Sequence, residues 1–198
     1  VDSSAVKDLV VFSDIAVDSV GGVHISYSGG GAGGAWSVRY AYFDGTSWTK
    51  DIITTSGYYS TIALDSDDNP RIAYGRSTGN KGISQATNVG GSWTYDIVSY
   101  STYPYGAAHP SIVIDDDDVS HISSRNYYSK NYGTTQYFYL AYSTNKYSAG
   151  WETDVVDTQS GALRYTQIAL DSQGYPHITY TQWGSLRSLR YANASLAE

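Results

Sequence analysis

The chain has 198 residues, of which 41% are hydrophobic and 16% are charged, so it can bury a core and is not a disordered acidic chain. Its formal net charge of -7 argues against binding to nucleic acid or anionic membranes. It has no cysteine, which excludes disulfides and thiolate metal sites. It also lacks methionine and any apolar run of membrane-spanning length, so we expect a processed or excised chain. Its 21 tyrosines, 20 glycines and few charges are typical of an extracellular or cell-surface β protein.

A short apolar block that ends on aspartate recurs four times, at intervals of roughly fifty residues. A second block starts six residues past each aspartate, a third ends on alanine, and a fourth, present in three copies, starts with tryptophan. The first blocks are Ser13–Asp18, Ser60–Asp65, Pro110–Asp115 and Thr166–Asp171, and the second blocks start at His24, Arg71, His121 and His177. The third blocks end at Ala41, Ala86, Ala141 and Ala192, and the fourth blocks start at Trp48, Trp93 and Trp151.

Each block alternates β-branched or aromatic residues with small or polar ones, which is typical of a β-strand. The connection between the first and second blocks carries Gly21, Asp68, Asp118 or Gly174 at one position. These residue types tolerate the positive φ of a tight turn. Each repeat is therefore predicted to be a four-stranded antiparallel meander with strands A to D, and no helix is predicted.

A single meander cannot bury both of its faces, so the repeats must pack on one another. The inner strand has large residues such as Ile62 and Leu64 on one face and a small one, Ala63, on the other. Radial stacking of large faces on small faces buries both and leaves only short edges. The predicted fold is an all-β, single-domain β-propeller with four blades of four-stranded antiparallel sheets, or a fragment of a larger propeller; a β-helix or a sandwich fits less well.

The repeats cover approximately residues 12–56, 59–101, 109–160 and 165–198 of the single domain 1–198. The last repeat lacks its tryptophan-led strand, and Val1–Ser4 resemble Val156–Gln159, the end of such a strand. Residues 1–6 are therefore expected to complete the last blade and close the ring. The alternative is that the chain is part of a longer propeller, or that it completes a ring as a homo-oligomer or with other propeller segments.

The segment Ile168–Tyr180 reads Ile-Ala-Leu-Asp-Ser-Gln-Gly-Tyr-Pro-His-Ile-Thr-Tyr. This pattern is similar to repeats of secreted bacterial and archaeal propellers of the BNR or sialidase-like superfamily. The resemblance covers nearly the whole chain and implies the fold rather than an activity. The sialidase Asp box, Ser-x-Asp-x-Gly-x-x-Trp, is degenerate here, because Asp44–Trp48 has the aspartate next to the glycine and Val89–Trp93 has no aspartate.

Glycoside hydrolases usually need two carboxylates, and sialidases use a tyrosine nucleophile instead. The resemblance also implies an arginine triad for a sialidase. The chain has two glutamates, Glu152 on a D strand and Glu198 as the last residue, and none of its arginines falls in a motif that matches the triad. We therefore assign no catalytic residue and favour a non-enzymatic chain, with the enzyme left open.

His24, His121 and His177 occupy one repeat position, where a ring of metal ligands is conceivable. A residue repeated at one position more often serves blade packing or a hairpin hydrogen bond. The acidic turns Asp65–Asn69 and Asp115–Asp118 offer carboxylates to calcium, but aspartate is also the default residue of a tight turn. We therefore expect no metal and no cofactor, with calcium as the alternative.

Function tends to lie on variable loops carried by a rigid scaffold, here the B–C loops and the D–A connections. These segments are rich in aromatic and polar residues, which suit sugar rings and protein surfaces. The predicted ligand-binding residues are Trp36, Tyr58, Tyr59, Arg76, Tyr103, Tyr105, His109, Arg125, Tyr127, Tyr128, Tyr165 and Trp183. Asp14, Thr61, Ser111 and Gln167 open the inner strands, differ in every repeat, and are predicted to line the mouth of the central channel.

The sequence thus predicts an extracellular or cell-surface, non-enzymatic module that binds a glycan or a protein. It predicts no nucleic-acid partner and no membrane insertion. Two alternatives stay open. One is a sialidase-like glycoside hydrolase or its inactive remnant, and the other is a structural cell-surface or assembly module.

Overall fold

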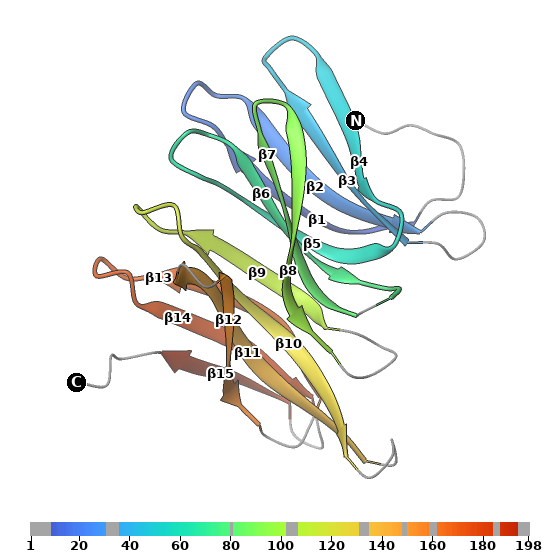
Figure 1. Ribbon diagram of the computed structural model, residues 1–198, viewed down its shortest axis with the longest axis vertical. Coiled ribbons are helices and arrows are strands. Elements are labelled where there is room, and N and C mark those ends of the chain that lie inside the picture. The colour runs from blue at the N-terminus through green and yellow to red at the C-terminus, as the bar shows by residue number, and fades with distance from the viewer. Residues whose placement is uncertain are drawn as a thin grey trace.

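The computed structural model describes residues 9–30, 36–79, 81–101, 107–130, 135–147, 150–158, 162–183 and 187–193. Its strands form four antiparallel sheets that fan out as the blades of a β-propeller, which confirms the fold predicted from the repeats (Figure 1). Across these residues no α-helix is present, and thus none that is long and apolar enough to cross a membrane.

Each blade runs from an inner strand A to an outer strand D. Blade 1 comprises β1 (Leu9–Val17), β2 (Val23–Gly30), β3 (Trp36–Phe43) and β4 (Trp48–Thr54). Blade 2 comprises β5 (Gly57–Leu64), β6 (Pro70–Arg76), β7 (Gly82–Val89) and β8 (Ser92–Tyr100). Blade 3 comprises β9 (Ala108–Ile114), β10 (Ser120–Lys130), β11 (Thr135–Tyr147) and β12 (Gly150–Asp157). Blade 4 has three strands within the described ranges, β13 (Ala162–Leu170), β14 (Pro176–Trp183) and β15 (Ser188–Asn193).

The fourth strand of the last blade was expected from residues 1–6, and these lie outside the described residues. The expectation that the N-terminus completes this blade therefore stays a prediction.

The turn between strands A and B is held by the aspartate that ends each first block. In blade 1, Asp18 Oδ1 accepts hydrogen bonds from the backbone N–H groups of Val20 (3.1 Å) and Gly22 (2.6 Å). The other blades repeat this pattern. The residue three positions past the aspartate has a φ between 59° and 90° in every blade, as predicted. These residues are Gly21, Asp68, Asp118 and Gly174.

Neighbouring blades bury hydrophobic side chains between them. Ile62 of blade 2 lies in one cluster with Val38 of blade 1, and Ala16 packs at the margin of that cluster. Ile112 of blade 3 occupies the same position in the next cluster, where Ala63 of blade 2 packs against it. The predicted packing of large faces on small faces is therefore confirmed at these two interfaces. Full burial of one such isoleucine contributes about 1.5–3 kcal/mol.

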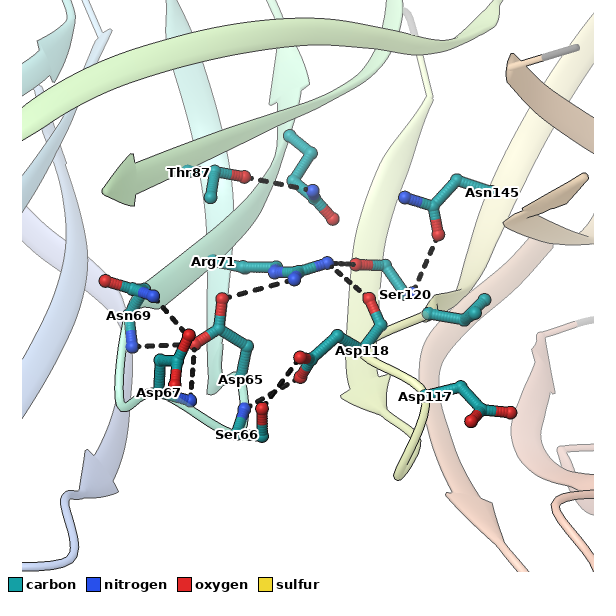
Figure 2. Close-up of polar contacts among 12 residues, drawn as sticks. Asp65, Ser66, Asp67, Asn69, Arg71, Thr87, Asp117, Asp118, Ser120 and Asn145 are labelled. Carbon is teal, nitrogen blue, oxygen red and sulfur yellow. Dashed lines mark hydrogen bonds and ion pairs between the residues drawn. The ribbon is translucent and has the colours of Figure 1, made fainter. Parts of the chain in front are cut away.

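Polar contacts also join blades 2 and 3, at their A–B turns (Figure 2). Ser66 donates from its backbone N–H and from Oγ to the two carboxylate oxygens of Asp118, each at 2.7 Å. Arg71 stands where the other blades have histidine. Its guanidinium donates to Asp65 Oδ2 (3.1 Å) in its own blade, and to the Asp118 carbonyl (2.7 Å) and Ser120 Oγ (3.1 Å) in the next blade. The longer side chain thus bridges two blades.

Replacing Arg71 by histidine restores the residue of the other blades but removes the contacts with blade 3. We expect Arg71→His to lower the free energy of unfolding by about 1–2 kcal/mol, because two charge-assisted hydrogen bonds are lost. Urea unfolding followed by tryptophan fluorescence measures the change. The exposed Lys50 on β4 provides the control, since Lys50→His should change stability by less than about 0.5 kcal/mol. Equal stability of Arg71→His and the unaltered protein would contradict the bridging role.

Candidate functional site

The inner strands of blades 2, 3 and 4 share an irregularity near their first residues. Tyr59, His109 and Tyr165 have positive φ values of 56°, 52° and 51°, a conformation that bulky residues rarely adopt. At these points the pairing of each inner strand with strand B skips residues, which marks a β-bulge. Bulges redirect side chains, and backbone strain of this kind concentrates at functional sites.

These three residues and Phe12, which holds the same repeat position in blade 1, pack together. The distances between ring centroids are 4.2 Å for Phe12 and Tyr59, 4.1 Å for Tyr59 and His109, and 4.7 Å for His109 and Tyr165. The rings are tilted relative to one another, as aromatic pairs prefer. We call these four residues the aromatic cluster.

The aromatic cluster lines a cavity of about 560 Å³ that is formed by one short stretch from each of the four inner strands. Asp14, Thr61, Ser111 and Gln167 lie two residues further along each strand and line the same cavity. The four predicted channel-mouth residues therefore surround one space, and ligand binding by them stays a prediction. The volume lies within the range of small-molecule sites, roughly 300–1,000 Å³.

The polar residues of the cavity are tied together across blade boundaries. Asp14 Oδ2 accepts hydrogen bonds from Thr61 Oγ1 (2.6 Å) and from the backbone N–H of Ile62 (2.9 Å). Ser111 Oγ donates to Gln167 Oε1 at 3.4 Å. Contacts between blades 1 and 2 and between blades 3 and 4 thus fix the polar wall below the aromatic cluster.

Arginine side chains lie close to the aromatic cluster. Burial first, and then the charges of Arg125 and Arg164, lower the pKa of His109 from 6.5 to about 3, so the imidazole is neutral at neutral pH. The guanidinium of Arg125 lies 5.2 Å from the centroid of the Phe138 ring and donates to the carbonyl of Leu163 at 3.4 Å. A chain with a net negative charge therefore places positive charge near His109 of the aromatic cluster.

The structure brings several predicted ligand-binding residues together. Tyr59, His109 and Tyr165 belong to the aromatic cluster, and Tyr58 packs edge-on against Tyr59 with 4.9 Å between ring centroids. Arg125 lies near enough for its charge to act on His109. These five residues come from blades 2, 3 and 4.

Other predicted residues lie away from the cavity. Arg76 donates to the carbonyl of Ser99 at 2.9 Å, with its guanidinium 5.4 Å from the centroid of the Tyr100 ring, in the outer half of blade 2. Tyr127 is buried against Phe138 at 4.8 Å within blade 3. Neither Arg76 nor Tyr127 lines the cavity.

Five further predicted residues remain, of which one is described in full, two are described by their backbones alone, and two are not described. Trp36 is half-buried at the start of β3. Tyr128 and Trp183 belong to β10 and β14, but only their backbones are described. Tyr103 and Tyr105 lie outside the described residues.

The assignment of several predicted ligand-binding residues to loops was wrong. Tyr59, His109 and Tyr165 lie inside inner strands, and the B–C hairpin of blade 3 continues in paired strands to Lys130 and Thr135. The physical reason is that polar, tyrosine-rich segments lack hydrophobic alternation, yet cross-strand pairing still satisfies their backbone groups.

The aromatic position also belongs to the repeat, which sequence reasoning did not detect. Phe12, Tyr59, His109 and Tyr165 all lie two residues before a channel residue, so the aromatic position recurs in every blade. Sequence reasoning missed Phe12 altogether. Extending the repeat alignment by two residues upstream would have found it.

The repeated histidines lie at the other end of the inner strands, beside the A–B turns. In blade 3, His121 Nδ1 lies 2.6 Å from the Tyr142 hydroxyl and Nε2 lies 3.0 Å from Asp115 Oδ2. His24 and His177 make the same two contacts in blades 1 and 4. These are the hairpin hydrogen bonds predicted as the more common role, and across the described ranges no group of three or more metal-binding side chains occurs.

Neither a protein-family model nor a curated protein sequence matches the chain. Solved propellers match its structure. A xylan β-1,4-xylosidase from Bacillus halodurans C-125 has a TM-score of 0.61 at 12% identity, covering 98% of this chain and 43% of the enzyme. An endo-arabinase from Bacteroides thetaiotaomicron VPI-5482 has a TM-score of 0.60 at 13% identity, covering 100% and 80%. A leech intramolecular trans-sialidase has a TM-score of 0.52 at 15% identity, covering 93% and 31%.

This chain thus spans less than half of the xylosidase and of the trans-sialidase. At these identities the likeness shows the fold alone. All three neighbours are carbohydrate-active enzymes by their own descriptions.

His109 makes the stability of the fold depend on pH. Its pKa in the folded chain is about 3, so below pH 6.5 the unfolded chain takes up a proton that the folded chain does not. The stability linked to this group is complete above pH 6.5 and is lost as the pH falls toward 3, at about 1.4 kcal/mol per pH unit between these values.

Tyrosine is the matched replacement, because it holds the same left-handed position in blades 2 and 4. The drop in free energy of unfolding from about pH 7 to about pH 5 should be smaller in His109→Tyr than in the unaltered protein by about 1–2 kcal/mol. Urea unfolding at both pH values measures it. The same drop in both proteins would contradict the buried, neutral histidine.

Proposed function

We propose that the chain is a non-enzymatic, extracellular module that binds a glycan at the aromatic cluster. One observation carries the proposal: the backbone is held in a strained, bulged conformation in three blades, and the result is a set of aromatic rings around a polar cavity. Strain of this kind persists where it positions side chains for a function.

The chemistry of the cavity suits a sugar ring. Aromatic faces supply flat apolar contact for the C–H faces of a sugar, and the tyrosine hydroxyls add polar ends. Thr61, Ser111 and Gln167 supply hydroxyl and amide groups that can both donate and accept hydrogen bonds. A cavity that combines apolar walls with a few polar groups is typical of small-ligand sites.

The carboxylates of the described residues favour binding over hydrolysis. Asp14 is the single acidic residue among those that line the cavity, and its Oδ2 already accepts two hydrogen bonds. Glu152 lies on β12, the exposed outer strand of blade 3. Most glycosidases need two carboxylates, one on either side of the scissile bond. The described residues that line the cavity include no such pair.

The structural neighbours support a sugar as the ligand class rather than a protein surface. Proteins described as a xylosidase, an endo-arabinase and a trans-sialidase share this fold. A glycan is therefore the ligand to test first, and a protein ligand is the alternative outcome.

Two tyrosines of similar exposure allow a matched test. Tyr165 in the aromatic cluster is 50% exposed, and Tyr95 on β8, away from the cavity, is 53% exposed. Labelled protein is applied to a glycan array, and titration calorimetry then measures the affinity for the best oligosaccharide. We expect Tyr165→Ala to weaken binding at least about tenfold, because it removes a stacking surface, and Tyr95→Ala to bind as the unaltered protein does.

Three results would contradict the proposal. They are retention of no glycan on the array, equal affinity of Tyr165→Ala and the unaltered protein, and release of new reducing ends from the bound oligosaccharide. The third result would favour the hydrolase.

A further inference from the structure

Two sheet faces of the fan carry large apolar side chains in contact with solvent. We call the face of blade 1 that points away from blade 2 the leading flank, and the face of blade 4 that points away from blade 3 the trailing flank. The leading flank presents Ile15, Val17 and Trp48, and the trailing flank presents Leu189 and Tyr191. Figure 1 shows these two blades at opposite ends of the fan. Isolated exposed apolar residues are ordinary, but grouped ones mark interaction surfaces.

At two of these repeat positions, the equivalent side chain is buried where a sibling blade lies beside it. Ile15 is 61% exposed, whereas Ile62, its equivalent in blade 2, is 5% exposed. Tyr191 is 57% exposed, whereas Tyr40, its equivalent in blade 1, is 6% exposed. The two flanks therefore have the composition of blade interfaces, and the described residues supply no facing blade for either of them.

The interface between blades 1 and 2 shows what each flank would contact. There Tyr40 of blade 1 meets Trp93 of blade 2 edge-to-face, with 5.2 Å between ring centroids. Ile62 lies in the same buried cluster as Tyr40 and Val38. One blade thus contributes a tyrosine and an aliphatic residue, and the next contributes a tryptophan and an isoleucine.

The two flanks carry the two halves of this interface. Tyr191 and Leu189 of blade 4 stand at the positions of the tyrosine and the aliphatic residue, and Trp48 and Ile15 of blade 1 stand at those of the tryptophan and the isoleucine. The match holds residue by residue between two faces of one chain. A second copy of the chain therefore offers each flank its complement.

We propose that two copies of this chain dock head to tail, the trailing flank of each on the leading flank of the other, and close an eight-bladed ring. Both flanks of both copies are then buried. A head-to-tail contact forms a closed ring only if the rotation that relates one copy to the next returns to the first copy. Eight blades lie within the usual range of about four to eight for a propeller. This proposal does not depend on a glycan ligand.

Native mass spectrometry and sedimentation equilibrium of the full chain test the proposal. We expect a mass of twice 21.5 kDa for the unaltered protein. Ile15→Asp and Leu189→Asp should each return the mass to 21.5 kDa, because each places a carboxylate at both interfaces of the dimer. Both residues are exposed in the single chain, so circular dichroism should show an unchanged fold. Val89→Asp alters a residue that is 59% exposed near a turn of blade 2, and it should leave the dimer intact.

Mixing the two variants tests the head-to-tail arrangement. A heterodimer of Ile15→Asp and Leu189→Asp keeps one intact interface, so an equimolar mixture should recover part of the dimer that neither variant forms alone. If the two copies instead packed leading flank on leading flank and trailing flank on trailing flank, mixing the two variants would not restore the dimer. A monomer at every soluble concentration, a mass that grows beyond two copies, or a dimer that survives Ile15→Asp would each overturn the proposal.

Discussion

The structure depends on one constraint, which is that a four-stranded sheet of this size has two apolar faces and cannot bury both by itself. Each inner strand carries large residues on one face and a small residue on the other, so that neighbouring blades can pack together. Ile62 packs towards Ala16 of the preceding blade, and Ile112 packs towards Ala63 in the same way. Repetition of this contact turns the sheets around an axis, as in other β-propellers.

The candidate site is a consequence of the same arrangement. When the blades fan around an axis, equivalent stretches of the four inner strands come together, and the side chains of these stretches form one surface. In this chain the bulges direct Tyr59, His109 and Tyr165 into that space, and burial keeps the imidazole of His109 uncharged. The A–B turns at the far ends of the strands have a structural role instead, because the Asp-His-Tyr contacts and the Arg71 bridge hold each hairpin and join two blades.

Much of the fold could be predicted because the residues that determine its turns and its packing recur at fixed positions of the repeat. The turn residues Asp68 and Asp118 have the positive φ that their place in the repeat demands, and the large and small residues of the inner strands meet as the alternation requires. The aromatic cluster could not be reached by the same route. Its left-handed residues interrupt the alternation, so a search for strand periodicity assigns them to connecting loops.

The two flanks show a different limit of sequence reasoning. Ile15 and Ile62 are the same residue at the same repeat position, so no local pattern tells the buried one from the exposed one. Only the arrangement of all four blades reveals which copies have a facing sheet. The cavity residues Asp14, Thr61, Ser111 and Gln167 likewise differ between blades, so the periodicity that predicts the scaffold carries no information about a ligand.

The central claim, that one blade is stabilised by the face of the next, is tested most directly by a double-mutant cycle on Tyr40 and Trp93. Their rings meet edge-to-face across blades 1 and 2, so the two alanine substitutions should show a coupling energy of about 0.5–1.5 kcal/mol in urea unfolding. The cycle of Tyr40 with Trp48, the equivalent tryptophan of its own blade, should show coupling near zero. Coupling of Tyr40 to Trp48 and not to Trp93 would contradict the account.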